Sequence, residues 1–93
     1  MTDETASLAE KYISAVEDAL KELKSAESLS ETGSEKIRHI IDAAERYMMD
    51  AKYYLQAGKK ATALASVSYA EGLLDALRML ELISFEWKRV DRS

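Results

Sequence analysis

Cysteine and proline are absent from this 93-residue chain, and glycine occurs at only three positions. The lack of cysteine excludes disulfides, thiolate chemistry and cysteine-ligated zinc, and it is typical of a reducing compartment, so we expect a cytoplasmic protein. With no proline and so little glycine, the chain has few residues that interrupt helices. Hydrophobic residues make up 47% and charged residues 32% of the sequence, a balance that favours an ordered, helical domain over a disordered chain.

Basic residues are also fewer than acidic ones. The chain has 13 basic and 17 acidic residues, which give a formal net charge of −4. Nucleic-acid-binding proteins normally carry a basic patch, so we do not expect a nucleic-acid partner, and RNA association stays only as a weaker alternative. No apolar run approaches the roughly 18 residues of a membrane span, and the polar N-terminus does not resemble a signal peptide. These features predict a soluble protein with no membrane partner and a single domain over residues 1–93.

Apolar residues repeat at helical spacing in three stretches and predict helices over about 3–26, 35–57 and 60–88. Thr2 or Asp3 is expected to cap the first helix, and a cluster of serine, threonine and glycine over 28–34 indicates a turn. Gly58 suits the left-handed position that often ends a helix, so the second and third helices should form a tight hairpin. The sequence therefore predicts an all-α fold, a three-helix up-and-down bundle.

The third predicted helix differs from the others because it carries two stripes that avoid charge. One stripe is made of bulky residues, namely Leu64, Val67, Leu74 and Leu77. The other is made of small residues, namely Ala61, Ala65, Ser68, Gly72 and Ala76. A helix that avoids water on two faces can contact two neighbours, so we expect a long central third helix.

Folding the chain back about its two turns predicts which residues lie opposite one another. Across the first turn, Tyr12 is expected near Met48. Across the second turn, Arg46 is expected opposite Glu71, and Asp42 within reach of Asp75 and Arg78.

Residues 50–58 read Asp-Ala-Lys-Tyr-Tyr-Leu-Gln-Ala-Gly, and residues 63–78 read Ala-Leu-Ala-Ser-Val-Ser-Tyr-Ala-Glu-Gly-Leu-Leu-Asp-Ala-Leu-Arg. This segment resembles domain-of-unknown-function family 357, which is found in archaea. The resemblance implies a compact helical bundle of the spectrin-like or albumin-binding-module type. It implies no established activity.

A polar cluster on the third predicted helix supplies the candidate binding residues, which are Tyr54, Tyr69, Glu71, Asp75 and Arg78. Glu71 and Asp75 are one helical turn apart, so their like charges favour a nearby cation. One interpretation is a binding site for a small molecule or nucleotide, with carboxylates flanked by tyrosines and an arginine. The alternative is a structural network that joins Arg46 to Glu71 and Arg78 to Asp75 or Asp42.

Signatures of metal sites and of common enzymes are missing. His39 is the only histidine, and Glu35 lies one turn before it, whereas metal sites in helical bundles use paired Glu-x-x-His motifs on two helices. No glycine-rich phosphate loop or nucleophile motif occurs in the sequence. We therefore expect no metal, no cofactor and no enzymatic activity.

The C-terminal stretch is apolar on too many sides for a helix that covers one neighbour. Its candidate interface residues are Met79, Leu82, Ile83, Phe85 and Trp87. An exposed patch of this kind usually marks association, and a symmetric dimer is the commonest form. In the alternative, this stretch bends back and packs its aromatic residues over the open end of the bundle. The leading functional hypothesis is a non-enzymatic interaction or scaffold module that self-associates through its third helix, with an unidentified protein partner left open.

Overall fold

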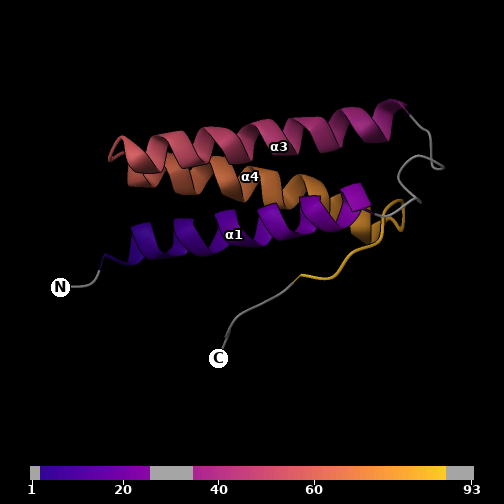
Figure 1. Ribbon diagram of the computed structural model, residues 1–93, viewed down its shortest axis with the longest axis horizontal. Coiled ribbons are helices and arrows are strands. Elements are labelled where there is room, and N and C mark those ends of the chain that lie inside the picture. Colours follow the sequence, from indigo (N-terminus) through magenta and orange to yellow (C-terminus); the bar gives the residue numbers. More distant parts are fainter. Residues whose placement is uncertain (1–2, 26–34, 88–93) are drawn as a thin grey trace.

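The computed structural model describes residues 3–25 and 35–87 and shows three helices packed side by side (Figure 1). Helix α1 spans Glu4–Ser25, α3 spans Glu35–Gln56 and α4 spans Lys60–Met79. α1 and α4 run in one direction and α3 runs in the other. The predicted all-α, three-helix up-and-down bundle is confirmed, and the described residues contain no strand. The predicted turn over 28–34 lies outside the described residues.

The core lies along the axis between the three helices, and each helix contributes one apolar stripe. α4 packs against both other helices, most extensively against α3, and α1 and α3 touch each other least. In this sense α4 is central, as predicted. Its buried residues are Ala63, Val67, Ala70, Leu74 and Leu77. Alanines at Ala63 and Ala70 allow the neighbouring helices to approach closely, because they add almost no side-chain bulk.

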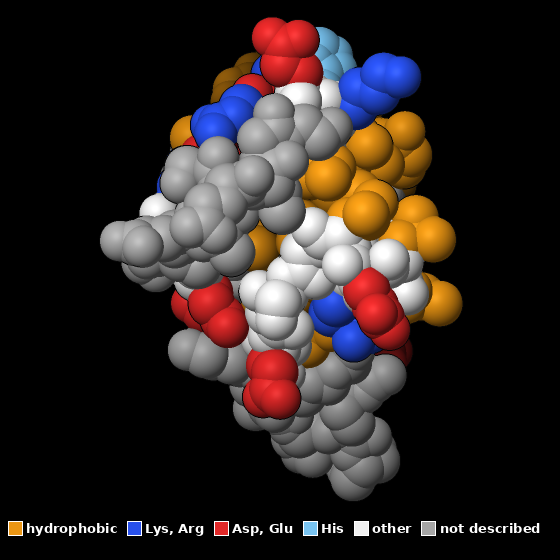
Figure 2. Space-filling view, turned by 90° about the vertical axis from the view of Figure 1, so that its right-hand side faces the viewer, with side chains coloured by type: hydrophobic (Ala, Val, Ile, Leu, Met, Phe, Trp, Pro, Cys, Tyr) orange, Lys and Arg blue, Asp and Glu red, His pale blue; other side chains and the backbone are white. Residues whose placement is uncertain are grey.

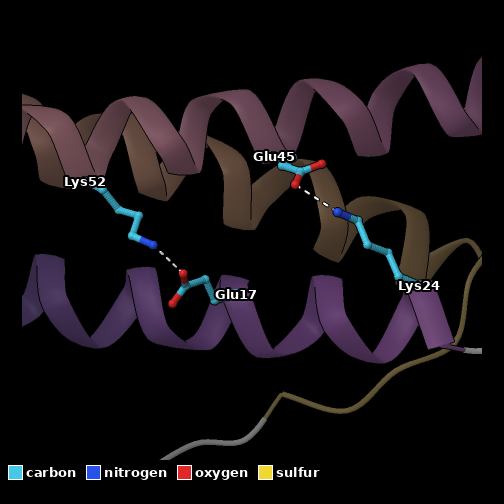
Figure 3. Close-up of polar contacts among 4 residues, drawn as sticks. All are labelled: Glu17, Lys24, Glu45 and Lys52. Atoms are coloured by element: carbon cyan, nitrogen blue, oxygen red, sulfur yellow. Dashed lines mark hydrogen bonds and ion pairs between the residues drawn. The ribbon is translucent and has the colours of Figure 1, made fainter.

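Two ion pairs join the polar edges of α1 and α3 (Figure 3). The Lys24 ammonium lies 2.9 Å from a Glu45 carboxylate oxygen, and Lys52 lies 2.5 Å from Glu17. The register that places Tyr12 near Met48 would put Lys24 opposite residue 36, nine positions before its observed partner, so that prediction is wrong. The two ion pairs show the register in which α1 and α3 lie side by side.

Asp3 caps the N-terminus of α1, which confirms one of the two predicted caps. Its Oδ1 accepts a hydrogen bond from the backbone N–H of Ala6 at 3.3 Å, and this satisfies one of the donors that a helix leaves unpaired at its start. Its other oxygen accepts a hydrogen bond from the Lys60 ammonium, at the start of α4. The Lys60 hydrogen bond and then the Ala6 hydrogen bond hold the pKa of Asp3 below its usual range.

Gly58 ends α3 in the left-handed conformation that the sequence predicts, with φ of 83°. Its N–H donates to the carbonyl of Leu55, and the N–H of Lys59 donates to the carbonyl of Tyr54. These two bonds form a Schellman motif, which satisfies the last carbonyls of the helix. α4 begins at the next residue, so the predicted tight hairpin between these two helices is confirmed.

The same motif ends α4 at Met79, which corrects the predicted helix over 60–88. Glu81 has φ of 62°; its N–H donates to the carbonyl of Arg78, and the N–H of Leu82 donates to the carbonyl of Leu77. The chain then reverses and returns along the bundle (Figure 1). α4 therefore has 20 residues and is the shortest of the three helices rather than a long one, since α1 and α3 have 22 each.

Candidate functional site

The side of α4 that faces away from the core carries no charge beyond Lys60. We call this surface the outer face of α4. Its residues are all exposed, and they are Ala61, Thr62, Ala65, Ser68, Tyr69, Gly72, Ala76 and Met79, continued past the helix end by Leu80. The charged residues of α4 after Lys60 are instead half-buried on its flank. This is the reverse of the arrangement expected for a helix with one face in water, where exposed positions are charged or polar.

The exposed apolar area is largest at the C-terminal end of this face. Met79 is 70% exposed and Leu80 is 67% exposed. Figure 2 views the molecule from the end at which α4 terminates and shows hydrophobic side chains gathered on one side. Isolated exposed leucines are common, but contiguous exposed apolar side chains mark contact surfaces.

Nothing in the part of the chain that the structure describes requires a glycine at position 72. A Cβ placed on it meets no atom within 4 Å, and its backbone is helical. Glycine in a helix interior costs about 1 kcal/mol relative to alanine. The bundle itself therefore gains nothing from Gly72, whereas a helix docked on the outer face would gain a closer approach of the two backbones.

Toward α3, the outer face is bordered by a pair of tyrosines. The rings of Tyr47 and Tyr69 pack edge to face with centroids 4.6 Å apart. The Ser66 hydroxyl donates a hydrogen bond to the carbonyl of Tyr47 at 2.8 Å. Tyr54 packs instead against Tyr53, with centroids 5.6 Å apart. The two tyrosines of the predicted binding cluster therefore lie against different partners.

On the opposite flank of α4, Asp75 is held by groups from its own chain. Its Oδ1 accepts hydrogen bonds from the guanidinium of Arg78 at 2.9 and 3.1 Å and from the indole N–H of Trp87 at 2.9 Å. The predicted structural link between Arg78 and Asp75 is present. Within the part of the chain that the structure describes, Glu71 has no ion-pair partner, so the predicted pair with Arg46 does not form.

The five candidate binding residues do not converge on one pocket. Tyr69 faces α3, whereas Asp75 and Arg78 face the returning C-terminal segment. An open groove lies elsewhere, on α3 alone, and its lining residues are Asp42, Glu45, Arg46, Tyr47, Met49 and Asp50. None of the five candidates lines it.

The five candidate interface residues divide between core and surface. Phe85 is buried in the core at 5% exposure, and Ile83 and Trp87 are half-buried against it. The rings of Phe85 and Trp87 pack edge to face, 4.7 Å apart. The alternative in which this stretch bends back over the bundle is therefore what the structure has. Met79 and Leu82 stay exposed.

The sequence contained the signal for the outer face, since the stripe of small residues from Ala61 to Ala76 was apparent. The sequence did not indicate that this stripe is exposed, because a stripe of small residues is equally typical of a buried contact. No pattern in the sequence predicts the hydrogen bond between Trp87 and Asp75, since this bond depends on the return of the chain after Met79.

Searches for metal and membrane features give negative results over the described parts of the chain. Residues 3–25 and 35–87 contain no group of three or more His, Asp or Glu side chains placed to hold a metal ion. None of the three helices is both long and apolar enough to span a bilayer.

Comparison with known proteins matches the chain to a family. The model of the family described as protein of unknown function (DUF357) matches residues 11–83, which cover most of the chain. No curated protein and no solved structure matches the sequence.

Proposed function

The chain belongs to the DUF357 family of proteins of unknown function, and we propose that it is a non-enzymatic helical interaction or scaffold module that self-associates through the outer face of α4. The observation that carries this proposal is the lack of charge on every exposed residue of α4 after Lys60. Exposed positions on α1 and α3 are mostly charged by comparison, as in Glu10, Lys21 and Asp42. A surface without charge loses little hydration when a partner covers it.

Energetics also favour a partner on this face. Burial of apolar surface contributes roughly 25 cal/mol per Å², and Met79 and Leu80 are the most exposed large hydrophobic residues of α4 and its cap. Small side chains such as Ala65 and Ala76 lose almost no rotamer entropy on association. The face therefore gains apolar burial at low cost in side-chain ordering.

The absence of cysteine supports a cytoplasmic location for this module. The alternative function, binding of a small molecule or nucleotide, requires Tyr69, Asp75 and Arg78 to contact the same ligand. The contacts of Tyr69 and of Asp75 lie on opposite flanks of α4, which does not favour this alternative.

The test is sedimentation equilibrium at protein concentrations from micromolar to millimolar. We expect the apparent mass to rise with concentration for the wild-type chain and to stay at the monomer value for Ala65→Glu, which places a charge on the outer face. Met49→Glu is the matched control, because Met49 is exposed on α3 and its change should leave association intact. A wild-type chain that stays monomeric at millimolar concentration contradicts the proposal.

A further inference from the structure

We infer that the occupant of the outer face of α4 is the same face of a second copy, lying antiparallel and centred near Ala70; this inference rests on the proposed function. Ala61 and Met79 are each nine residues from Ala70, so this centre places Ala61 of one copy opposite Met79 of the other. Two observations lead to this orientation: the difference in side-chain size between the two ends of the face, and the opposite charges next to the two helix ends.

The two ends of the outer face differ in side-chain size. The N-terminal half presents Ala61 and Ala65, whereas the C-terminal end presents Met79 and Leu80, which are 70% and 67% exposed. Close packing requires large side chains to meet small ones. An antiparallel pair satisfies this at both ends, whereas a parallel pair sets Met79 against its own copy and leaves a gap between the alanines.

The residues that flank the two ends of α4 carry opposite charges and lie equally far from Ala70. Lys59 precedes the helix and Glu81 follows it, and each is 11 residues from Ala70. Both are exposed, and neither forms an ion pair among the described residues. Antiparallel packing brings Lys59 of each copy to Glu81 of the other, at both ends of the interface. Parallel packing would instead bring like charges together, which is unfavourable.

The size of the face predicts a weak dimer. A helix of 20 residues is about 30 Å long at 1.5 Å per residue, and a helix contact is roughly 10 Å wide, so the footprint is about 300 Å². Stable interfaces bury about 800 Å² per partner. The complex should therefore exchange rapidly and be populated at high concentration, and a covalent trap is the suitable probe.

Because the chain has no cysteine, single-cysteine variants report contacts without background from native thiols. Equimolar Ala61→Cys and Met79→Cys are mixed at high concentration and oxidised mildly, and the products are identified by non-reducing electrophoresis and intact mass. We expect the mixed disulfide between the two variants to exceed either self-linked dimer by about tenfold. Ser14→Cys, an exposed position on α1, measures disulfide formation by random collision.

The outcomes separate this inference from the proposed function. Predominance of self-linked Ala61→Cys and self-linked Met79→Cys means parallel packing, which overturns the inference and leaves self-association through α4 standing. Yields no higher than those of Ser14→Cys for every pair, together with a monomer in sedimentation, overturn both. Yields at that background with a dimer in sedimentation place the contact on another surface and also overturn both.

Charge reversal provides an independent check of the register. Lys59→Glu and Glu81→Lys should each weaken the dimer about two- to thirtyfold, because each substitution removes two exposed ion pairs from the symmetric dimer. The double variant should regain wild-type affinity, because it restores both pairs with the signs exchanged. A double variant that is weaker than either single variant contradicts the pairing of Lys59 with Glu81.

Discussion

The two faces of α4 both lack charged residues, but one is buried in the core and the other is exposed. The inner face is built from Ala63, Val67, Ala70, Leu74 and Leu77, and none is more than 4% exposed. The outer face is also uncharged and also contains alanines, yet every residue of it is exposed. A helix face that lacks charge therefore indicates a contact surface. The lack of charge does not tell whether the contact lies within the chain or with another molecule.

The largest expected difference between the two faces is in stability. Leu74→Ala removes a side chain that is fully buried and leaves a cavity among three helices, so the free energy of unfolding should fall by about 2–5 kcal/mol. Leu80→Ala, on the exposed continuation of the outer face, should change it by less than about 0.5 kcal/mol. Urea denaturation at low protein concentration measures both. Similar losses for the two variants would mean that Leu80 is buried in solution and that the comparison fails.

The sequence predicted the three helices because their apolar periodicity is local and no residue interrupts it. Gly58 was predictable as a helix end for a similarly local reason, since its missing Cβ favours the left-handed conformation. The end of α4 at Met79 was not predictable, because Glu81 is not a residue that ordinarily ends a helix. The helix ends there because Phe85 reaches the core only if the chain turns back, which is a tertiary effect.

Half of the candidate site could be predicted from the sequence, because helical spacing is a local property. The pattern identified the small-residue stripe from Ala61 to Ala76 and the link between Arg78 and Asp75, both of which follow from helical spacing. It did not separate the exposed stripe from the buried one. That separation depends on where α1 lies, and in the structure α1 lies against α3 in a register that pairs Glu17 with Lys52.

The next effect compares the two helix ends that share one hydrogen-bonding motif. Gly58→Ala forces a Cβ into the left-handed conformation and should lower the free energy of unfolding by about 1 kcal/mol. Glu81→Gly relieves the same strain at the end of α4 and should raise it by about 0.5–1 kcal/mol. Thermal unfolding of the two variants beside the wild type measures both signs. Destabilisation by Glu81→Gly would show that the Glu81 side chain contributes more than its backbone conformation costs.

A smaller effect tests the outer face itself. Gly72→Ala adds a methyl group where no atom lies within 4 Å, so it should stabilise the isolated bundle by about 0.5–1 kcal/mol. The same methyl group separates the helices of a dimer packed over Gly72 and should weaken self-association. Denaturation at low concentration and sedimentation at high concentration read the two effects separately. Stabilisation with unchanged association would remove Gly72 from the contact surface.

The smallest expected effect is at the edge of α4, where Lys60 contacts Asp3. The pKa of Asp3 is lowered in the folded chain, chiefly by the hydrogen bond from Lys60, so the unfolded chain binds the proton more readily than the folded one. This contribution is fully present above the unfolded pKa of about 3.9 and is lost as the pH falls through the lower, folded value.

Asp3→Asn keeps a side chain that can cap α1 and removes the charge. The unfolding temperature of the wild type should therefore exceed that of Asp3→Asn at pH 6, and the difference should shrink below pH 4. Added salt should reduce the difference at pH 6, because the pair is exposed. A difference that is constant from pH 6 to pH 2 would assign the effect to the cap rather than to the charge.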